Sequence, residues 1–394
     1  MKFVLVLLMV VVMLVPAMVG ETAPSEYTVV VAYAAWNDEG WNQAHADAWE
    51  KVKVMGRVIS EGEYGFVTEL TNGTVLRVVY ITNCGEGADI EPMIRSAIMA
   101  HKPDMVYATW WTAKDAVRTL AEEFPKVKFN HCSGFPVLTS AQFPETNNVS
   151  TYFVRMYYED YKIGKLTVYM GLDTPTGMVG THTIPEPVRG ANAYQLGKDR
   201  ACVEMDCESQ PTMILWIKEW LDVEKETLAT ETLLGMGYKL IKQGADTPTT
   251  ARVASAEGAE DVTVLGYGRD TLPYGDKTLA TNEWAWYKFC LESVMAGIEG
   301  TWEPNDYWEI GTKMVYSDQV SQEIRDKVEA TPLDEVWAGP FSGYGYDLDG
   351  NLYHWSVPVG ETLLDKDLLE MQIYVDKIET GEHIQAEKFR FAVD

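Results

Sequence analysis

Short apolar runs alternate with amphipathic segments of helical length over residues 28–131. The apolar runs predict strands at 28–34, 75–81, 105–108 and 127–131. The segments between them predict helices at 42–54, 90–100 and 112–123. An insertion at 62–73 contains Asn72-Gly73, which is typical of a hairpin turn. Strands separated by helices of this length favour a parallel sheet with helices on both faces, that is, a doubly wound α/β lobe.

A second set of the same kind follows Asn147-Asn148-Val149-Ser150. Its pattern predicts helices at 156–170, 188–196, 224–236 and 249–257, and strands at 178–183, 212–218, 238–242 and 262–266. The alternation ends at residue 341. Residues 346–353 then have the composition of a hairpin turn, and 365–375 that of a helix. We therefore expect two consecutive α/β lobes and a tail that contains a hairpin.

Tryptophans follow several of the predicted strands. Trp36 and Trp41 come after the first strand, Trp110 and Trp111 after the strand at 105–108, and Trp220 after the strand at 212–218. Open α/β sheets bind ligands outside the carboxyl ends of their strands. Aromatic rings at that edge favour a flat or apolar small molecule. If the strand continues, Trp110 and Trp111 point to opposite sides, so only one of them faces such a site.

Length and composition fit an exported protein of two or three domains, with 394 residues of which 46% are hydrophobic. Lys2 followed by the apolar run 3–15 is typical of a secretory signal, and an uncleaved membrane anchor is the alternative. We assign residues 1–24 to this signal or anchor and its tether. No later window approaches membrane length, so we expect the rest of the chain to be soluble and extracytoplasmic.

The formal net charge of −27 disfavours binding to nucleic acid or anionic lipid, because both need clustered Lys and Arg. Five cysteines leave at least one unpaired in an exported chain. Cys202 and Cys207 flank a polar stretch and are the favoured disulfide. Cys84 and Cys132 both follow strand-like runs and would pair if those strands were neighbours. A zinc site at Cys202 and Cys207 would lack a second pair of ligands.

Catalytic patterns are missing from the sequence. The six histidines are scattered, and no His-Glu-x-x-His, Gly-x-Ser-x-Gly, phosphate loop or dinucleotide fingerprint is present. Asp347-Leu348-Asp349-Gly350 resembles part of a calcium loop but lacks the closing Glu, so we interpret it as a hairpin turn. We therefore expect no enzyme, no metal site and no cofactor. A nucleoside hydrolase, the distant alternative, would need a metal-binding aspartate cluster after the first strand, and Asn37-Asp38-Glu39 has too few aspartates for one.

Polar residues that also follow the predicted strands could form hydrogen bonds with a bound small molecule. The Asn42 amide can both donate to and accept from a heterocycle edge. Asp222, Asp246 and Asp270 each follow a strand-like run, where a carboxylate can accept from hydroxyls or an amine; a helix N-cap is the competing role for each. For Trp41 the competing role is packing at the start of the helix.

Several segments of the chain form a recognisable set of motifs. They are Gly40-Trp41-Asn42-Gln43, residues 129–134, 152–159, 220–222, 243–248, 300–302 and 306–308, and above all 180–197, which contains Ile-Pro-Glu-x-x-Arg-Gly-x-Asn-Ala. With these motifs the chain resembles the basic membrane protein family of substrate-binding proteins for ABC transporters, which includes the purine nucleoside receptors. The resemblance covers nearly all of 28–378.

The resemblance implies a type I periplasmic-binding-protein fold, in which two lobes are joined by three hinge crossings and hold a ligand between aromatic rings. The crossings would fall near 148–151, 281–284 and 311–314. The first lobe would contain 25–149 and 282–312, and the second 150–281 and 313–394, including the hairpin tail.

The resemblance also assigns roles to single residues. Trp41 would stack on the ligand, Asn42 would lie beside it, Trp220 would supply the second aromatic ring, and Asp270 would meet a ribose. Nucleoside receptors have a Lys near the second hinge, where this chain has Trp284 and Trp286.

With these tryptophans in place of the Lys, the chain resembles a branch of the family that takes free bases such as adenine. Two further departures are the missing lipoprotein cysteine after the signal and Gly244-Ala245 in place of a family His. The expected function is extracytoplasmic capture of a purine-type ligand, as a monomer, for an ABC permease. A sensor that signals to a membrane partner is the alternative.

Overall fold

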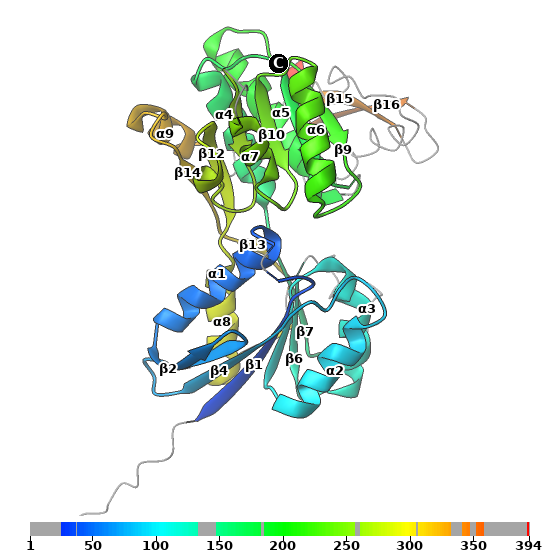
Figure 1. Cartoon of the computed structure of the whole chain (residues 1–394), viewed down its shortest axis with the longest axis vertical. Coiled ribbons are helices and arrows are strands. Elements are labelled where there is room, and N and C mark those ends of the chain that lie inside the picture. The colour runs from blue at the N-terminus through cyan, green and yellow to red at the C-terminus, as the bar shows by residue number, and fades with distance from the viewer. Residues whose placement is uncertain are drawn as a thin grey trace, which may run out of the picture.

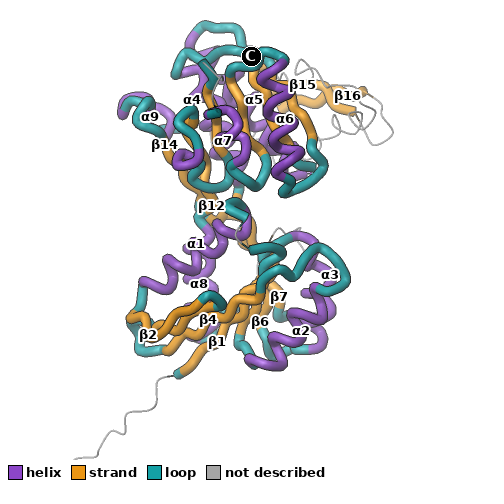
Figure 2. The backbone as a smooth tube through the Cα atoms, in the orientation of Figure 1, coloured by secondary structure: helices purple, strands orange, loops and turns teal. Residues whose placement is uncertain are grey.

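The computed structural model describes residues 25–36, 38–132, 147–182, 185–256, 261–304, 306–331, 341–346, 352–357 and 392–393. Two sheets, each flanked by helices, lie one beyond the other along the long axis of the molecule (Figure 1). The strands of the two sheets form separate groups that meet at a narrow waist (Figure 2).

The first sheet has eight strands in the order β13-β7-β6-β5-β1-β4-β3-β2. Its strands are β1 (Glu26–Ala32), β2 (Arg57–Gly62), β3 (Gly65–Glu69), β4 (Val75–Ile81), β5 (Met105–Ala108), β6 (Lys128–Cys132), β7 (Val149–Val154) and β13 (Asp306–Ile310). Neighbours are parallel except β2 and β3, which form an antiparallel edge on β4. Helices α1 (Trp41–Val54) and α8 (Trp286–Glu299) pack on one face, and α2 (Ile90–His101) and α3 (Lys114–Glu123) on the other.

The alternation of side chains along β1 explains its unbroken apolar run. Val29 and Val31 contribute to the core under α1 and α8, whereas Val30 and Ala32 contribute to the core under α2 and α3. A strand that is covered on both faces needs apolar residues at every position.

The second sheet has six strands in the order β14-β12-β11-β10-β8-β9. Its strands are β8 (Thr176–Gly180), β9 (Thr212–Trp216), β10 (Leu240–Gly244), β11 (Thr263–Gly266), β12 (Thr278–Trp284) and β14 (Thr312–Tyr316), and only β14 is antiparallel to its neighbour. The helices of this lobe are α4 (Met156–Tyr169), α5 (Pro185–Met205), α6 (Val223–Gly235), α7 (Thr249–Ser255) and α9 (Gln322–Glu329). A third sheet joins β15 (Phe341–Tyr346), β16 (Leu352–Val357) and β17 (Ala392–Val393).

The chain passes between the two large sheets three times within the described residues. It crosses between β7 and α4, between β12 and α8, and between β13 and β14. These crossings lie at 154–156, 284–286 and 310–312, a few residues from the boundaries that we predicted at 149, 281 and 312. The division into two independently moving lobes stays a prediction.

Cys202 and Cys207 form a disulfide, whereas Cys84, Cys132 and Cys290 are buried and form no disulfide within the described residues. Cys84 follows β4 and Cys132 ends β6. The pairing of these two cysteines would require neighbouring strands, but β1 and β5 lie between β4 and β6. That alternative was therefore wrong.

Some predictions fall outside the described residues, among them the signal or anchor at 1–24, the turn at 347–350 and the helix at 365–375. No helix within the described part of the chain is long and apolar enough to cross a membrane.

Candidate functional site

Helix α1 begins at the junction of the two lobes, where the Asp38 side chain caps its first turn. Asp38 Oδ1 accepts hydrogen bonds from the main-chain N–H groups of Gly40 (3.1 Å) and Gln43 (3.0 Å). Asp38 Oδ2 accepts from the main-chain N–H of Asn42 (2.9 Å) and from Asn42 Nδ2 (2.6 Å). Asn42 Oδ1 is buried and has no hydrogen-bond partner among the described residues. The capped turn thus fixes Trp41 and Asn42 at the junction of the two lobes and leaves one amide oxygen unused.

Four aromatic residues meet at this junction, namely Trp41, Phe153, Trp284 and Trp286, which we call the aromatic cluster. The ring of Trp41 lies 4.8 Å from that of Trp284, 5.4 Å from that of Trp286 and 6.1 Å from that of Phe153. Trp41 Nε1 donates to the main-chain oxygen of Thr109 at 2.6 Å, which fixes the orientation of the indole. Phe153 lies near the end of β7, while Trp284 and Trp286 flank the second crossing, so the cluster lies where the chain changes lobes.

His45 lies within the same packing and is neutral at physiological pH. Its ring stacks on Trp286 at 4.6 Å, and its Nδ1 is 3.1 Å from the main-chain oxygen of Trp41. Burial lowers the pKa of His45 to about 3. The indole nitrogens of Trp284 and Trp286 are buried without a hydrogen-bond partner in the described structure. The junction therefore contains unused donors from two indoles and one unused acceptor from Asn42.

A small pocket lies beside the aromatic cluster. It has a volume of about 40 Å³ and is lined by Ala44, Asp47, Ala48, Lys51, Gly268, Arg269, Glu283, Trp284, Trp286 and Tyr287. Such a pocket has room for a few water molecules, whereas ligand sites usually measure about 300 to 1,000 Å³. In this arrangement the pocket is therefore too small for a ligand of purine size.

Trp220 and Asp246 approach the junction from the second lobe. The ring of Trp220 contacts that of His182 at 4.7 Å, and the main-chain oxygen of Trp220 accepts from the N–H of Asp246 at 3.2 Å. Gly40 of the first lobe packs against the main chain of Asp246, because a Cβ at position 40 would lie 1.2 Å from the Asp246 carbonyl oxygen. The two loops are thus in direct contact.

Two other predicted carboxylates have local capping roles in the structure. Asp222 caps α6 by accepting from the N–H of Lys225 at 3.0 Å, and this hydrogen bond lowers the pKa of Asp222. Asp270 Oδ1 accepts from the N–H of Leu272 at 3.0 Å. Ligand contacts of these two residues stay predictions.

The remaining predicted tryptophans pack within the first lobe. Trp36 contacts the rings of Tyr33 and Tyr80 at 5.2 and 5.8 Å. Trp110 is only 5% exposed and belongs to the core under α2 and α3, whereas Trp111 is half-buried beneath Lys114.

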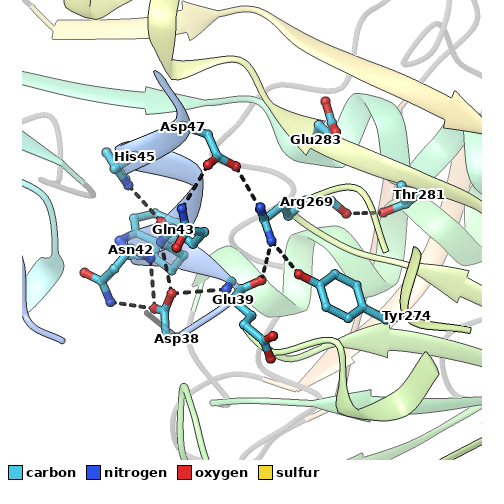
Figure 3. A network of polar contacts seen from close by, with 12 residues as sticks. Asp38, Glu39, Asn42, Gln43, His45, Asp47, Arg269, Tyr274, Thr281 and Glu283 are labelled. Atoms are coloured by element: carbon cyan, nitrogen blue, oxygen red, sulfur yellow. Dashed lines mark hydrogen bonds and ion pairs between the residues drawn. The ribbon is translucent and has the colours of Figure 1, made fainter. Parts of the chain in front are cut away.

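Ion pairs between the lobes were not foreseen in the sequence. Arg269 Nε donates to Asp47 Oδ2 at 2.9 Å, and Arg252 Nη2 lies 2.7 Å from Glu39 Oε2 (Figure 3 draws the Arg269 contacts). The partners are more than 200 residues apart, so no local pattern connects them. No group of three or more His, Cys, Asp or Glu side chains in the described residues is arranged to hold a metal.

A family model and two curated relatives match this chain. A family model described as "ABC transporter substrate-binding protein PnrA-like" matches residues 26–325. A purine-binding protein of Brucella abortus is 26% identical over 351 residues, which are 84% of this chain and 93% of the relative. A putative ABC transporter glucose-binding protein of Haloferax volcanii is 28% identical over 248 residues, 60% of this chain and 59% of the relative.

Solved structures confirm the predicted type I periplasmic-binding-protein fold. An ABC transporter solute-binding protein of Conexibacter woesei superimposes with a TM-score of 0.58 at 19% identity, covering 77% of this chain and 94% of that one. A solute-binding protein of Aeropyrum pernix gives 0.57 at 13% identity, covering 90% and 86%. At these identities the likeness shows the fold alone.

Proposed function

Because the chain belongs to the PnrA-like family of ABC transporter substrate-binding proteins, we propose that it captures a purine-type ligand outside the cytoplasmic membrane and delivers it to an ABC permease. The family establishes a small-molecule ligand and a transporter partner. The purine class, the site residues and the mode of closure are our proposal.

The observation that carries the proposal is the aromatic cluster at the start of α1. Trp41 presents an indole at the junction of the lobes, and Asn42 beside it has a buried, unused amide oxygen. A purine offers a flat ring for stacking and N–H groups that can donate to such an oxygen. Each aromatic stacking contact contributes roughly 0.5 to 1.5 kcal/mol beyond area burial. The purine-binding relative supports the same ligand class.

Binding would proceed by closure around the ligand. A ligand held on one lobe gains contacts with the other lobe only when the lobes are closed, so it raises the population of the closed state by that differential affinity. The close approach of Gly40 to the main chain of Asp246 supports such a closure, because it brings the two lobes into contact on this side of the molecule.

A free base is favoured over a nucleoside. The second crossing has Trp284 and Trp286, which are 6% and 0% exposed, so apolar rings occupy the region where nucleoside receptors have a Lys. Adenine is therefore the first probe, with adenosine, inosine and guanine as comparisons. Glucose is the competing ligand, because the Haloferax relative is named as a putative glucose-binding protein.

Titration calorimetry of the purified protein with these compounds tests the proposal. We expect adenine to bind with micromolar affinity or tighter, and Trp41→Ala to weaken binding at least tenfold while Trp111→Ala does not. Binding of glucose alone, or of no purine at all, would refute the purine assignment. Chromatography of adenine after long incubation should recover it unchanged, as a binding protein requires.

A further inference from the structure

Arg269 connects the two lobes through several contacts at once (Figure 3). It lies in the loop after β11, in the second lobe. Its Nε donates to Asp47 Oδ2 on α1 at 2.9 Å, and its Nη1 donates to the main-chain oxygen of Glu39 at 3.3 Å. Both acceptors belong to the first lobe and lie within the first two turns of α1 or just before them.

The guanidinium is held in place from its own lobe. Arg269 Nη1 also donates to Tyr274 Oη at 2.8 Å, and the main-chain oxygen of Arg269 accepts from Thr281 Oγ1 at 2.8 Å. Thr281 lies on β12, the strand that leads into the second crossing. The arginine is therefore oriented towards α1 before the lobes meet, which reduces the side-chain entropy lost on closure.

The acceptor on α1 is equally well fixed. Asp47 Oδ1 accepts from Gln43 Nε2 at 2.9 Å, and the main-chain N–H of Gln43 donates to Asp38. The carboxylate that receives Arg269 thus belongs to the same capped helix end that carries Trp41 and Asn42. A force applied through Asp47 acts on the helix that is proposed to hold the ligand.

We propose that Arg269 is an interlobe latch, a positioning residue that stabilises the closed state through Asp47 and Glu39 and so sets ligand affinity without touching the ligand. Its effect on affinity rests on the proposed function, whereas its effect on closure does not. The second pair, Arg252 with Glu39, is an accessory, because both side chains are 44% exposed and exposed pairs contribute little.

The side chains of Arg269 and Asp47 are 24% and 38% exposed, so salt should screen their attraction in part. Charged hydrogen bonds at this depth support a shift of roughly tenfold in the closed-to-open equilibrium. The dissociation rate of a bound ligand should rise by about the same factor when the latch is removed. The association rate should not fall, since an open cleft admits ligand more readily.

Small-angle X-ray scattering of the ligand-free protein tests the latch directly, at low and high NaCl concentrations. We expect the radius of gyration to rise with salt in the wild type and to be large at both concentrations in Arg269→Gln and in the isosteric Asp47→Asn. The matched control is Arg95→Gln, which removes a 32% exposed arginine that binds Glu91 and Glu123 within the first lobe. This variant should behave as the wild type.

Exchanging the charges of Arg269 and Asp47 distinguishes a latch from an arginine that has only a structural role. The double variant Arg269→Asp with Asp47→Arg should be more compact than either single variant. A radius of gyration in Arg269→Gln and Asp47→Asn equal to that of the wild type, at both salt concentrations, would overturn the proposal.

Stopped-flow tryptophan fluorescence with adenine gives the second readout. Arg269→Gln should raise the dissociation rate about tenfold with an undiminished association rate; a loss confined to the association rate contradicts the latch. If adenine binds to no variant and not to the wild type, the purine assignment fails, while the scattering experiment still decides the latch.

Discussion

Replacement of Glu226 by Gln should stabilise the protein at neutral pH and leave its stability unchanged in acid. Glu226 lies in the first turn of α6 and is fully buried. Its Oε2 accepts from Thr247 Oγ1 at 2.6 Å, and its Oε1 accepts from the N–H of Asp222 at 3.4 Å. No cation among the described residues pairs with it. Burial, with a smaller contribution from the Asp222 carboxylate, raises the pKa of Glu226 to about 7.

The sign of the effect follows from proton binding. In the unfolded chain this carboxyl has a pKa near 4.5, so between pH 4.5 and about 7 the folded state binds more protons than the unfolded state. The free energy of unfolding therefore falls as the pH rises through that window. The interval between 4.5 and about 7, at about 1.4 kcal/mol for each pH unit, sets an upper limit of about 3.5 kcal/mol.

Urea unfolding of the wild type, Glu226→Gln and Glu231→Gln from pH 4 to pH 8.5 measures this effect. Glutamine can still accept from Thr247 and carries no charge. The free energy of unfolding of Glu226→Gln should therefore exceed that of the wild type by up to about 3.5 kcal/mol above pH 7 and match it below pH 4.5. Glu231 is exposed on the same helix, so its replacement should follow the wild type. A difference between Glu226→Gln and wild type that does not change with pH would refute the reasoning.

Three further outcomes are expected. Gly40→Ala should prevent full closure, because its Cβ would collide with a main-chain oxygen of the second lobe, and calorimetry should show adenine binding weakened at least tenfold. The melting temperature should not fall in Gly40→Ala, whereas it should fall in Gly164→Ala. The buried ammonium of Lys242 lies 2.8 Å from Asp160 Oδ1, and Asp160→Asn leaves this charge unpaired. Urea titration should show the free energy of unfolding lowered by about 3 to 5 kcal/mol. The double variant Asp160→Leu with Lys242→Met should lower it less. Reduction of the Cys202–Cys207 disulfide, which closes a short loop, should lower the free energy of unfolding by about 2 kcal/mol, and the double Ala variant should not respond to reductant.

The regular elements could be predicted where the hydrophobic pattern is local. The run at 75–81 coincides with β4, and the helix at 90–100 is one residue shorter than α2. The sequence pattern did not point to β7 as a strand or to α8 as a helix. Both elements adjoin a crossing between the lobes. Their side chains pack against the junction of the lobes as well as against the core of one sheet, so their hydrophobic pattern does not follow a single buried face.

The candidate site could be predicted only in part, for a related reason. Trp41, Trp284 and Trp286 were singled out, and the structure brings their rings together. Asp222 and Asp270 were also singled out, but each accepts from the main chain of its own loop. A carboxylate that follows a strand can either cap the main chain of its own loop or contact a ligand. The capping hydrogen bond forms within one lobe, whereas a contact with a ligand between the lobes depends on both. The chain pattern alone cannot distinguish a cap from a ligand contact.

Helix α1 would link the proposed ligand recognition to the proposed lobe closure. Its first turn carries the proposed ligand contacts of Trp41 and Asn42, its second turn carries Asp47 for Arg269, and Gly40 just before it touches the opposite main chain. A rigid helix transmits any displacement of one of these groups to the others. In the proposed binding mode, a ligand that shifts Trp41 would also move the acceptor of the proposed latch, so that one element would set both affinity and lobe closure.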